Sequence, residues 1–169
     1  MKVHIAQADI ATLAVDAIVN PSNSQGSMDR GIGRMLCDQG GEDIHKAVSS
    51  KAPIAVGAAV VTHAGTLPAK FVIHVPTMPT PDEQIGVEHV RRATRAALLA
   101  ADASKFQVIG IPGIGTHVGG VAVEESARAI VEEIRTHKKA LPETIYLVDA
   151  SPDMMEAFED ALRAAQIGH

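Results

Sequence analysis

A series of short apolar runs, each followed at once by turn-forming residues, constrains the fold more than any other feature of this chain. The runs lie at residues 17–19, 71–75, 108–111 and 145–148. They lack polar alternation, which is typical of strands covered on both faces, as in a parallel sheet. Residues 2–7 and 58–64 are expected to form two further strands, nearer the edges of that sheet.

Helical patterns alternate with these runs. Residues 87–101 repeat apolar side chains at helical spacing, and residues 124–139 are acidic in the first turn and basic in the last, as the helix dipole favours. Ser151 and Pro152 are expected to begin a last helix. A shorter helical stretch within residues 29–48 is interrupted at its glycine pair. The alternation predicts a three-layer α/β/α sandwich around a mixed, mostly parallel sheet.

Length and composition indicate a globular chain. The 169 residues suit one domain spanning 1–169, and 46% of them are hydrophobic. No apolar run reaches the roughly 18 residues of a membrane span, and the first residues lack a secretory signal pattern. The one cysteine, Cys37, is expected in the core and suits a reducing compartment. We therefore expect a cytoplasmic protein that has no membrane partner.

The charge pattern argues against several other partners. The formal net charge is −5 with dispersed lysines and arginines, so no basic face for duplex nucleic acid is expected. Aromatic residues make up only 2% of the chain, too few for a base-stacking platform. His63 and His74 show no metal-ligand spacing. The sequence predicts no metal or cofactor, and we expect a monomer.

Two glycine-rich loops follow predicted strands and lead into predicted helices. They occupy residues 20–33 and 112–120. In a parallel sheet, the carboxyl ends of the strands form the ligand-binding crevice. Glycines let the backbone approach a ligand closely, and a helix N-terminus adds free N–H donors. Two such loops side by side predict a site for a diphosphate that needs no lysine.

Several motifs, in chain order, resemble the macrodomain family. Residues 9–10 and 15–24 (VDAIVNPSNS) are similar to its opening, and residues 28–33 (MDRGIG) stand at its glycine run. Residues 70–77 (KFVIHVPT) resemble its central strand, and residues 111–120 (IPGIGTHVGG) its second phosphate loop. The resemblance spans nearly the whole chain. It implies a macrodomain fold and a ligand that is ADP-ribose or an ADP-ribosylated protein or metabolite.

The resemblance also implies roles for individual residues. Asp9, beside Ile10, would accept a hydrogen bond from the adenine amino group, and Asn23 would bind the distal ribose. Asn20 would brace the loop backbone. The glycine run and the second loop would hold the diphosphate from its two sides. The implied ADP-ribose-binding residues are Asp9, Ile10, Asn20, Asn23, Gly31, Ile32, Gly33, Ile114, Gly115, Thr116, His117, Val118, Gly119 and Val148.

The chain departs from the family pattern at several of these positions. Gly33 stands where one hydrolase branch has an aspartate, His117 replaces a glycine, and Gly119 replaces a frequent aromatic residue. Asp29 and Arg30 add charge to the glycine run. The resemblance leaves open a substrate-assisted hydrolysis of ester-linked ADP-ribose, of the mono-ADP-ribosyl hydrolase or O-acetyl-ADP-ribose deacetylase type. Asn23 and His117 are its candidate catalytic residues.

Other functions remain open at this point. The chain is alternatively a non-catalytic ADP-ribose reader, or an interaction module with a vestigial pocket. A further alternative is an NAD-dependent oxidoreductase, because Gly113 and Gly115 resemble the start of a dinucleotide-binding fingerprint. Against it, the next glycine is one residue late, at Gly119, and too little chain follows for a second nucleotide-binding half.

Overall fold

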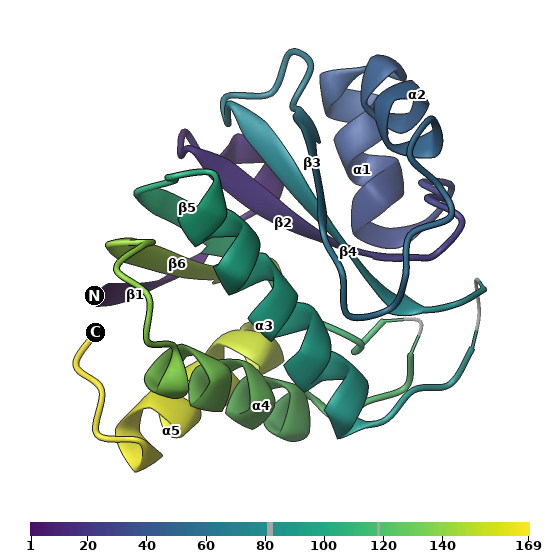
Figure 1. Ribbon diagram of the computed structural model, residues 1–169. Coiled ribbons are helices and arrows are strands. Elements are labelled where there is room, and N and C mark those ends of the chain that lie inside the picture. The colour runs from purple at the N-terminus through teal and green to yellow at the C-terminus, as the bar shows by residue number, and fades with distance from the viewer. Residues whose placement is uncertain (81–82, 118) are drawn as a thin grey trace.

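The computed structural model describes residues 1–80, 83–117 and 119–169, and these form a six-stranded sheet flanked by helices (Figure 1). The strand order is β1-β6-β5-β2-β4-β3, and every pairing is parallel except the antiparallel one between β3 and β4. The predicted edge strands, β1 and β3, are confirmed. The strands are β1 (Lys2–Gln7), β2 (Ala17–Asn23), β3 (Val60–His63), β4 (Phe71–Met78), β5 (Val108–Ile111) and β6 (Thr144–Asp149).

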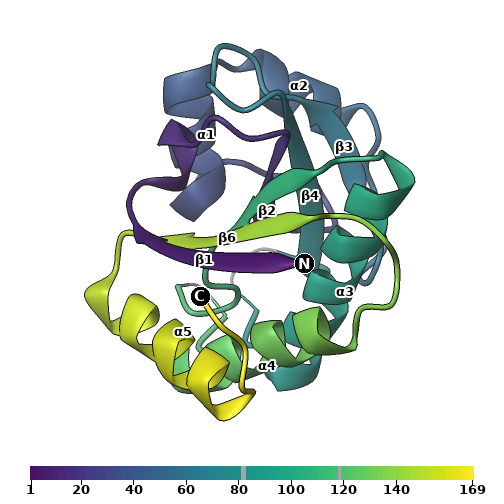
Figure 2. The same ribbon diagram turned by 90° about the vertical axis from the view of Figure 1, so that its left-hand side faces the viewer.

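The helices form two layers, one on each face of the sheet (Figures 1 and 2). Helices α1 and α2 cover one face, and α3, α4 and α5 cover the other. The predicted three-layer sandwich is therefore confirmed. The helices are the short 3-10 turn η1 (Ile10–Thr12), α1 (Gly31–Gly40), α2 (Asp43–Ser49), α3 (Val87–Ala103), α4 (Val123–Thr136) and α5 (Pro152–Ala164).

Strand β2 shows why the apolar runs lack polar alternation. Ala17 and Val19 pack into the core beneath α3, α4 and α5, whereas Ile18 packs into a second core beneath α1 and α2. All three side chains are fully buried. A strand with a core on each face has no solvent side, so both sets of alternating positions are apolar.

Two strands extend further than predicted. β2 continues through Pro21 to Asn23, and β4 continues through Pro76 to Met78. The pairing of β2 with β5 ends at Ile18, so beyond that residue β2 pairs on one side only, with β4. A proline, which lacks an N–H donor, is tolerated on such an unpaired edge. The prolines therefore lie inside strands, where the sequence pattern predicts loops.

Helix α4 is shorter than predicted. It ends at Thr136, because His137 has an extended backbone and its ring Nε2 lies 2.8 Å from the Leu141 carbonyl oxygen. Lys138 and Lys139 are therefore outside the helix, and Arg135 is the basic residue of its last turn. The other helix predictions are confirmed: the break between α1 and α2 falls at the glycine pair, and Ser151 caps α5. Within the described residues, no helix combines the length and apolar character of a membrane span.

Candidate functional site

A cleft lies at the carboxyl end of the sheet and has two chambers. The inner chamber is lined by Asn23, by the start of α1 and by glycines of the loop after β5. The outer chamber is lined by Asp9 and Ile10 before and within η1, and by Val148 and Asp149 at the end of β6. Three residues line both chambers and mark where they meet: Gly31, Ile32 and His117.

The N-terminus of α1 stands at this junction. Arg30 occupies the N-cap position, and its side chain makes no capping hydrogen bond in the described structure. The first amide bonded back within this turn is that of Arg34, to the Arg30 carbonyl, so the preceding amides have no partner in the helix. Gly31 has φ +60°, and an added Cβ there would meet open space. This end of α1 can therefore accept an anion.

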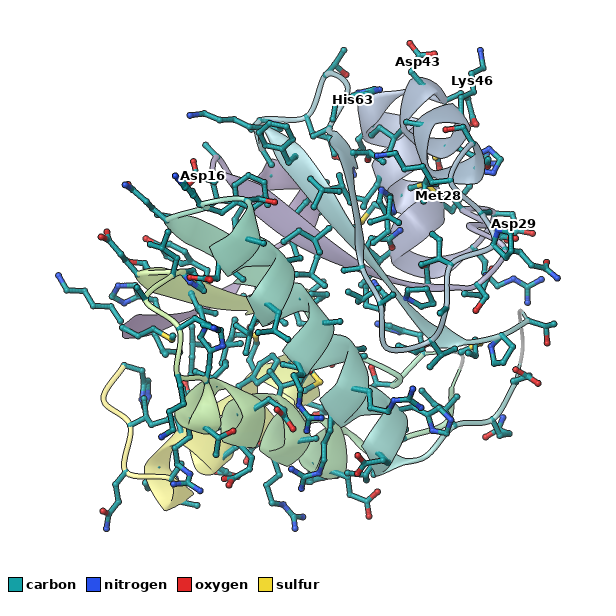
Figure 3. The ribbon with its side chains drawn as sticks, in the orientation of Figure 1. Asp16, Met28, Asp29, Asp43, Lys46 and His63 are labelled. Carbon is teal, nitrogen blue, oxygen red and sulfur yellow. The ribbon has the colours of Figure 1, made fainter. Side chains whose placement is uncertain are left out.

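Gly33 lies in the first turn of α1, packed over Met28. An added Cβ would lie 3.2 Å from Met28 Cα, so a side chain at this position needs a small backbone shift. In Figure 3, Met28 lies under α1, whereas Asp29 points away from it at the surface. The buried Met28 thus supports the turn that leads into the helix.

The second glycine loop contributes only part of its predicted residues to the cleft. Gly115 and Gly119 line the inner chamber, Thr116 is half-buried beside them, and Val118 lies outside the described residues. Ile114, in contrast, is fully buried in the core. The Ser126 hydroxyl of α4 binds its backbone, accepting from Ile114 N (3.2 Å) and donating to its carbonyl (2.7 Å). The prediction that Ile114 lines the ligand site is corrected, because its side chain is in the core and both backbone polar groups of Ile114 bind Ser126 of helix α4.

Gly119 has no space for the aromatic residue that many family members carry there. An added Cβ would lie 2.6 Å from Ile85 Cγ1 and 2.9 Å from the Gly115 carbonyl oxygen. Ile85 also donates its backbone N–H to the Gly119 carbonyl at 3.0 Å. The segment before α3 therefore fills the space in which a side chain at this position would lie.

Asn23 lies at the end of β2, where the register with β4 shifts. It is buried, and its Oδ1 accepts hydrogen bonds from the backbone N–H groups of Gln25 (3.0 Å) and Ser27 (3.4 Å). These bonds fix the orientation of an amide that lines the inner chamber. Its Nδ2 group is the donor that such an orientation leaves for other partners.

Asn20 is placed differently from the prediction. Its side chain is fully buried within the sheet and braces a neighbouring strand instead of the loop backbone. Nδ2 lies 3.1 Å from His74 Nδ1, and His74 Nε2 lies 2.8 Å from Thr62 Oγ1. Since the Thr62 hydroxyl donates to the His63 carbonyl at 3.1 Å, it accepts from His74 Nε2–H. Asn20 therefore links β2, β4 and β3 and does not contact the cleft.

The burial of His74 keeps its ring neutral. Desolvation, with a smaller contribution from the Lys51 charge, lowers the pKa of His74 from 6.5 to about 3. The neutral ring accepts at Nδ1 and donates at Nε2, as the contacts with Asn20 and Thr62 require.

Asp9 is the N-cap of η1, and both of its carboxylate oxygens accept hydrogen bonds. Oδ1 accepts from Ala11 N at 2.9 Å, and Oδ2 accepts from Gln39 Nε2 at 2.9 Å. Each oxygen retains a second lone pair, so the carboxylate can still accept from a ligand. Ile10 beside it is buried, as is Val148 across the outer chamber.

Asp149 lines the cleft but is not among the site residues predicted from the sequence. Its carboxylate is 8% exposed and lines the outer chamber. Oδ2 accepts from Gly113 N at 3.1 Å, and Oδ1 accepts from Ser151 N at 3.0 Å. The available signal was an acidic residue that directly follows a buried strand and precedes the N-cap Ser151 of α5.

The remaining histidine and cysteine candidates differ in whether they line the cleft. His117 is exposed and lines both chambers, whereas His63 is an exposed residue of β3. Cys37 is buried with its Sγ 3.7 Å from Met28 Sδ, and burial is the main cause that raises the pKa of its thiol. Among the described residues, no group of three His, Cys, Asp or Glu side chains is arranged to hold a metal ion.

Comparisons with known proteins found relatives that match most of the chain. A protein of Aquifex aeolicus is 46% identical over 162 residues, which cover 96% of this chain and 98% of that protein. A protein of Escherichia fergusonii named O-acetyl-ADP-ribose deacetylase is 34% identical over 156 residues, 87% of each chain.

Solved structures share the fold at lower identity. A mutant Oceanobacillus iheyensis macrodomain with ADPR has a TM-score of 0.84 and 20% identity, and the match covers 96% of this chain and 92% of that one. A Trypanosoma brucei macrodomain in complex with ADP-ribose has a TM-score of 0.82 and 20% identity, with 95% and 68% covered. The family model described as Macro domain matches residues 19–130. The chain therefore belongs to the macrodomain family.

Proposed function

We propose that this chain binds ADP-ribose, with the adenosine in the outer chamber and the distal ribose in the inner one. The observation that carries the proposal is the N-terminus of α1 at the junction of the two chambers, bordered by Gly31, Ile32 and His117. A ligand with a ring system at each end and an anionic centre matches this order of surfaces. ADP-ribose has that order.

The diphosphate is held mainly by backbone groups. The first amides of α1 have no helical partner, and the helix dipole is positive at this end. Gly115 and Gly119 of the facing loop line the same space. Neither chamber has a lysine among its described lining residues, and Arg30, at the N-cap of α1, is the arginine that lines the inner chamber.

The two ring systems are bound by different chemistry. In the outer chamber, Asp9 accepts from the adenine amino group while Ile10 and Val148 provide apolar contact. In the inner chamber, the Asn23 amide binds the hydroxyls of the distal ribose, since its Oδ1 is already held by the backbone. Asn20 does not take part directly.

The chain also hydrolyses ester-linked ADP-ribose in this proposal. The relative in Escherichia fergusonii that bears the name O-acetyl-ADP-ribose deacetylase supports this assignment. Water adds to the acyl carbon, the bond between that carbon and the ribose oxygen breaks, and the ribose oxygen takes a proton. Asn23 fixes the distal ribose, the bound diphosphate orients the water, and His117 carries the proton at the junction.

Gly33 favours a second candidate function, that of a non-catalytic reader. The position lacks the carboxylate that one hydrolase branch uses, and the contact with Met28 leaves little space for one. A reader retains the binding site and has no turnover. Incubation with O-acetyl-ADP-ribose decides between the two: release of acetate that is lost in Asn23→Ala identifies an esterase, and unchanged substrate identifies a reader.

Calorimetric titration tests the binding itself. ADP-ribose is compared with ADP, AMP and NAD for the wild-type chain and for Asp9→Ala. We expect ADP-ribose to bind most tightly. Asp9→Ala should weaken the binding of all four ligands, because each of them carries adenine. Absence of heat with ADP-ribose at millimolar concentration contradicts the proposal.

A further inference from the structure

We propose that Asp149 and Asp9 make the outer chamber selective against nucleotides that carry a phosphate on the adenosine ribose. The inference rests on the proposed function, because it concerns which adenosine derivatives that chamber accepts. The chemical class that it admits is an adenosine with an unmodified ribose. The class that it rejects is a 2′- or 3′-phosphorylated adenosine.

Asp149 occupies the place that a phosphate would otherwise take. The N-terminus of α5 faces the outer chamber, and such an end normally attracts anions. Here the amide of Ser151, beside that end, and the amide of Gly113 both donate to the Asp149 carboxylate, at 3.0 and 3.1 Å. The Ser151 hydroxyl accepts from a further amide, Met154 N, at 3.3 Å. The protein's own carboxylate and hydroxyl therefore satisfy these donors.

The packing around Asp149 keeps this carboxylate in place. An added Cβ at Gly113 would lie 2.6 Å from Met154 Sδ and 3.1 Å from Asp149 Oδ2. Gly113 therefore has no room for a side chain, and its backbone sits directly against the carboxylate. Asp149 is 8% exposed, so water screens its charge only weakly.

Asp9 adds a second negative charge to the same chamber. Its carboxylate is fixed by Ala11 N and Gln39 Nε2, at 2.9 Å each. The other described lining residues of the outer chamber include no lysine or arginine, and the histidine among them is His117. A phosphate on the adenosine ribose would thus meet two carboxylates and no fixed cation.

The N-terminus of α1 provides the contrast within the same cleft. Its N-cap residue is Arg30, its first turn contains no acidic residue, and no side chain caps it in the described structure. One helix N-terminus of the cleft is thus left for an anion, and the other is closed by carboxylate and hydroxyl groups. This asymmetry directs phosphates to the junction of the chambers and keeps them out of the outer chamber.

Calorimetric competition between ADP-ribose and its 2′-phosphate tests the inference. Measurements are made at pH 8, where ordinary imidazoles are mostly uncharged. We expect the wild-type chain to bind the 2′-phosphate on the order of tenfold or more weakly than ADP-ribose, since two unit charges within several ångströms interact by about this much. Raising the salt concentration should reduce the difference in part, through the half-buried Asp9 more than through the buried Asp149, whereas steric exclusion would not depend on salt.

Charge-removing variants assign the effect to the two residues. Asp9→Asn keeps an N-cap oxygen for Ala11, and the Gln39 amide can turn to accept from it, so this variant removes charge with little structural change. Asp149→Asn removes the second charge but keeps only one of two backbone bonds. Asp153→Asn, on the exposed first turn of α5, is the matched control with the same change in net charge.

The outcomes separate this inference from the proposed function. The inference is supported if the ratio of the two affinities, for ADP-ribose and for its 2′-phosphate, falls severalfold in Asp9→Asn and in Asp149→Asn and is unchanged in Asp153→Asn. Equal binding of both ligands to the wild-type chain overturns it while ADP-ribose binding stands. A salt-independent preference that survives both substitutions also overturns it. Absence of ADP-ribose binding defeats the proposed function itself.

Discussion

The buried His74 should make the stability of this protein depend on pH in a predictable way. Its folded pKa of about 3 lies well below the ordinary value of 6.5, chiefly because the ring is buried. Between these values the unfolded chain binds a proton at His74 and the folded chain does not. Stability contributed by the neutral ring is therefore fully present above pH 6.5 and is lost as the pH falls toward 3.

The size of the effect follows from the two pKa values. Each pH unit below 6.5 costs about 1.4 kcal/mol of unfolding free energy, so roughly 2 kcal/mol is lost by pH 5. His74→Gln removes the titration. A glutamine can still present an acceptor to Asn20 and a donor to Thr62, which preserves the link between β2, β4 and β3.

Urea unfolding at pH 8, 7, 6 and 5 measures this difference. The wild-type chain should lose roughly 2 kcal/mol more than His74→Gln between pH 8 and pH 5. His169→Gln, at the exposed C-terminus, is the control and should follow the wild-type curve. If His74→Gln and the wild-type chain have parallel stability curves, the reasoning about the buried neutral ring is refuted.

Three further predictions concern single contacts. Gly119→Ala should lower the unfolding free energy by about 1–3 kcal/mol, because the added Cβ would lie 2.6 Å from Ile85 and 2.9 Å from a backbone oxygen. Urea unfolding measures the change, and a variant as stable as the wild-type chain would contradict the prediction. Arg95→Ala should lower the unfolding free energy by about 1–2 kcal/mol, because the buried Glu133 carboxylate loses the guanidinium that lies 2.8 Å away. Adding Glu133→Gln should recover part of this loss, and additive losses in the double-mutant cycle would contradict the prediction. Asn23→Ala should weaken the binding of ADP-ribose by about tenfold in calorimetry and leave the binding of ADP, which lacks the distal ribose, little changed. Equal losses of affinity for both ligands would show that Asn23 does not bind the distal ribose.

Much of the fold follows from local sequence patterns. Apolar runs without polar alternation predicted the sheet and the helices on both its faces, and Ile18 and Val19 show the physical basis, since each packs into a different core. The extension of β2 through Pro21 could not be predicted this way. It depends on the early end of the pairing with β5, which is a property of the sheet.

The site was less predictable than the fold. The glycine loops and Asn23 have local signals, and the structure brings Asn23, Gly31, Gly33, Gly115 and Gly119 to one chamber. Asn20 resembles Asn23 in sequence, yet its position within the strand turns it toward His74, 54 residues away. Asp149 meets Gly113 only when β5 and β6 pair. Such contacts depend on strand order, which no local pattern contains.

A crystal structure of the protein with ADP-ribose would show where each part of the ligand binds. We expect the diphosphate at the first amides of α1, the adenine beside Asp9 and the distal ribose beside Asn23. A ligand bound outside the two chambers, or one with its adenine in the inner chamber, contradicts the assignment of the cleft.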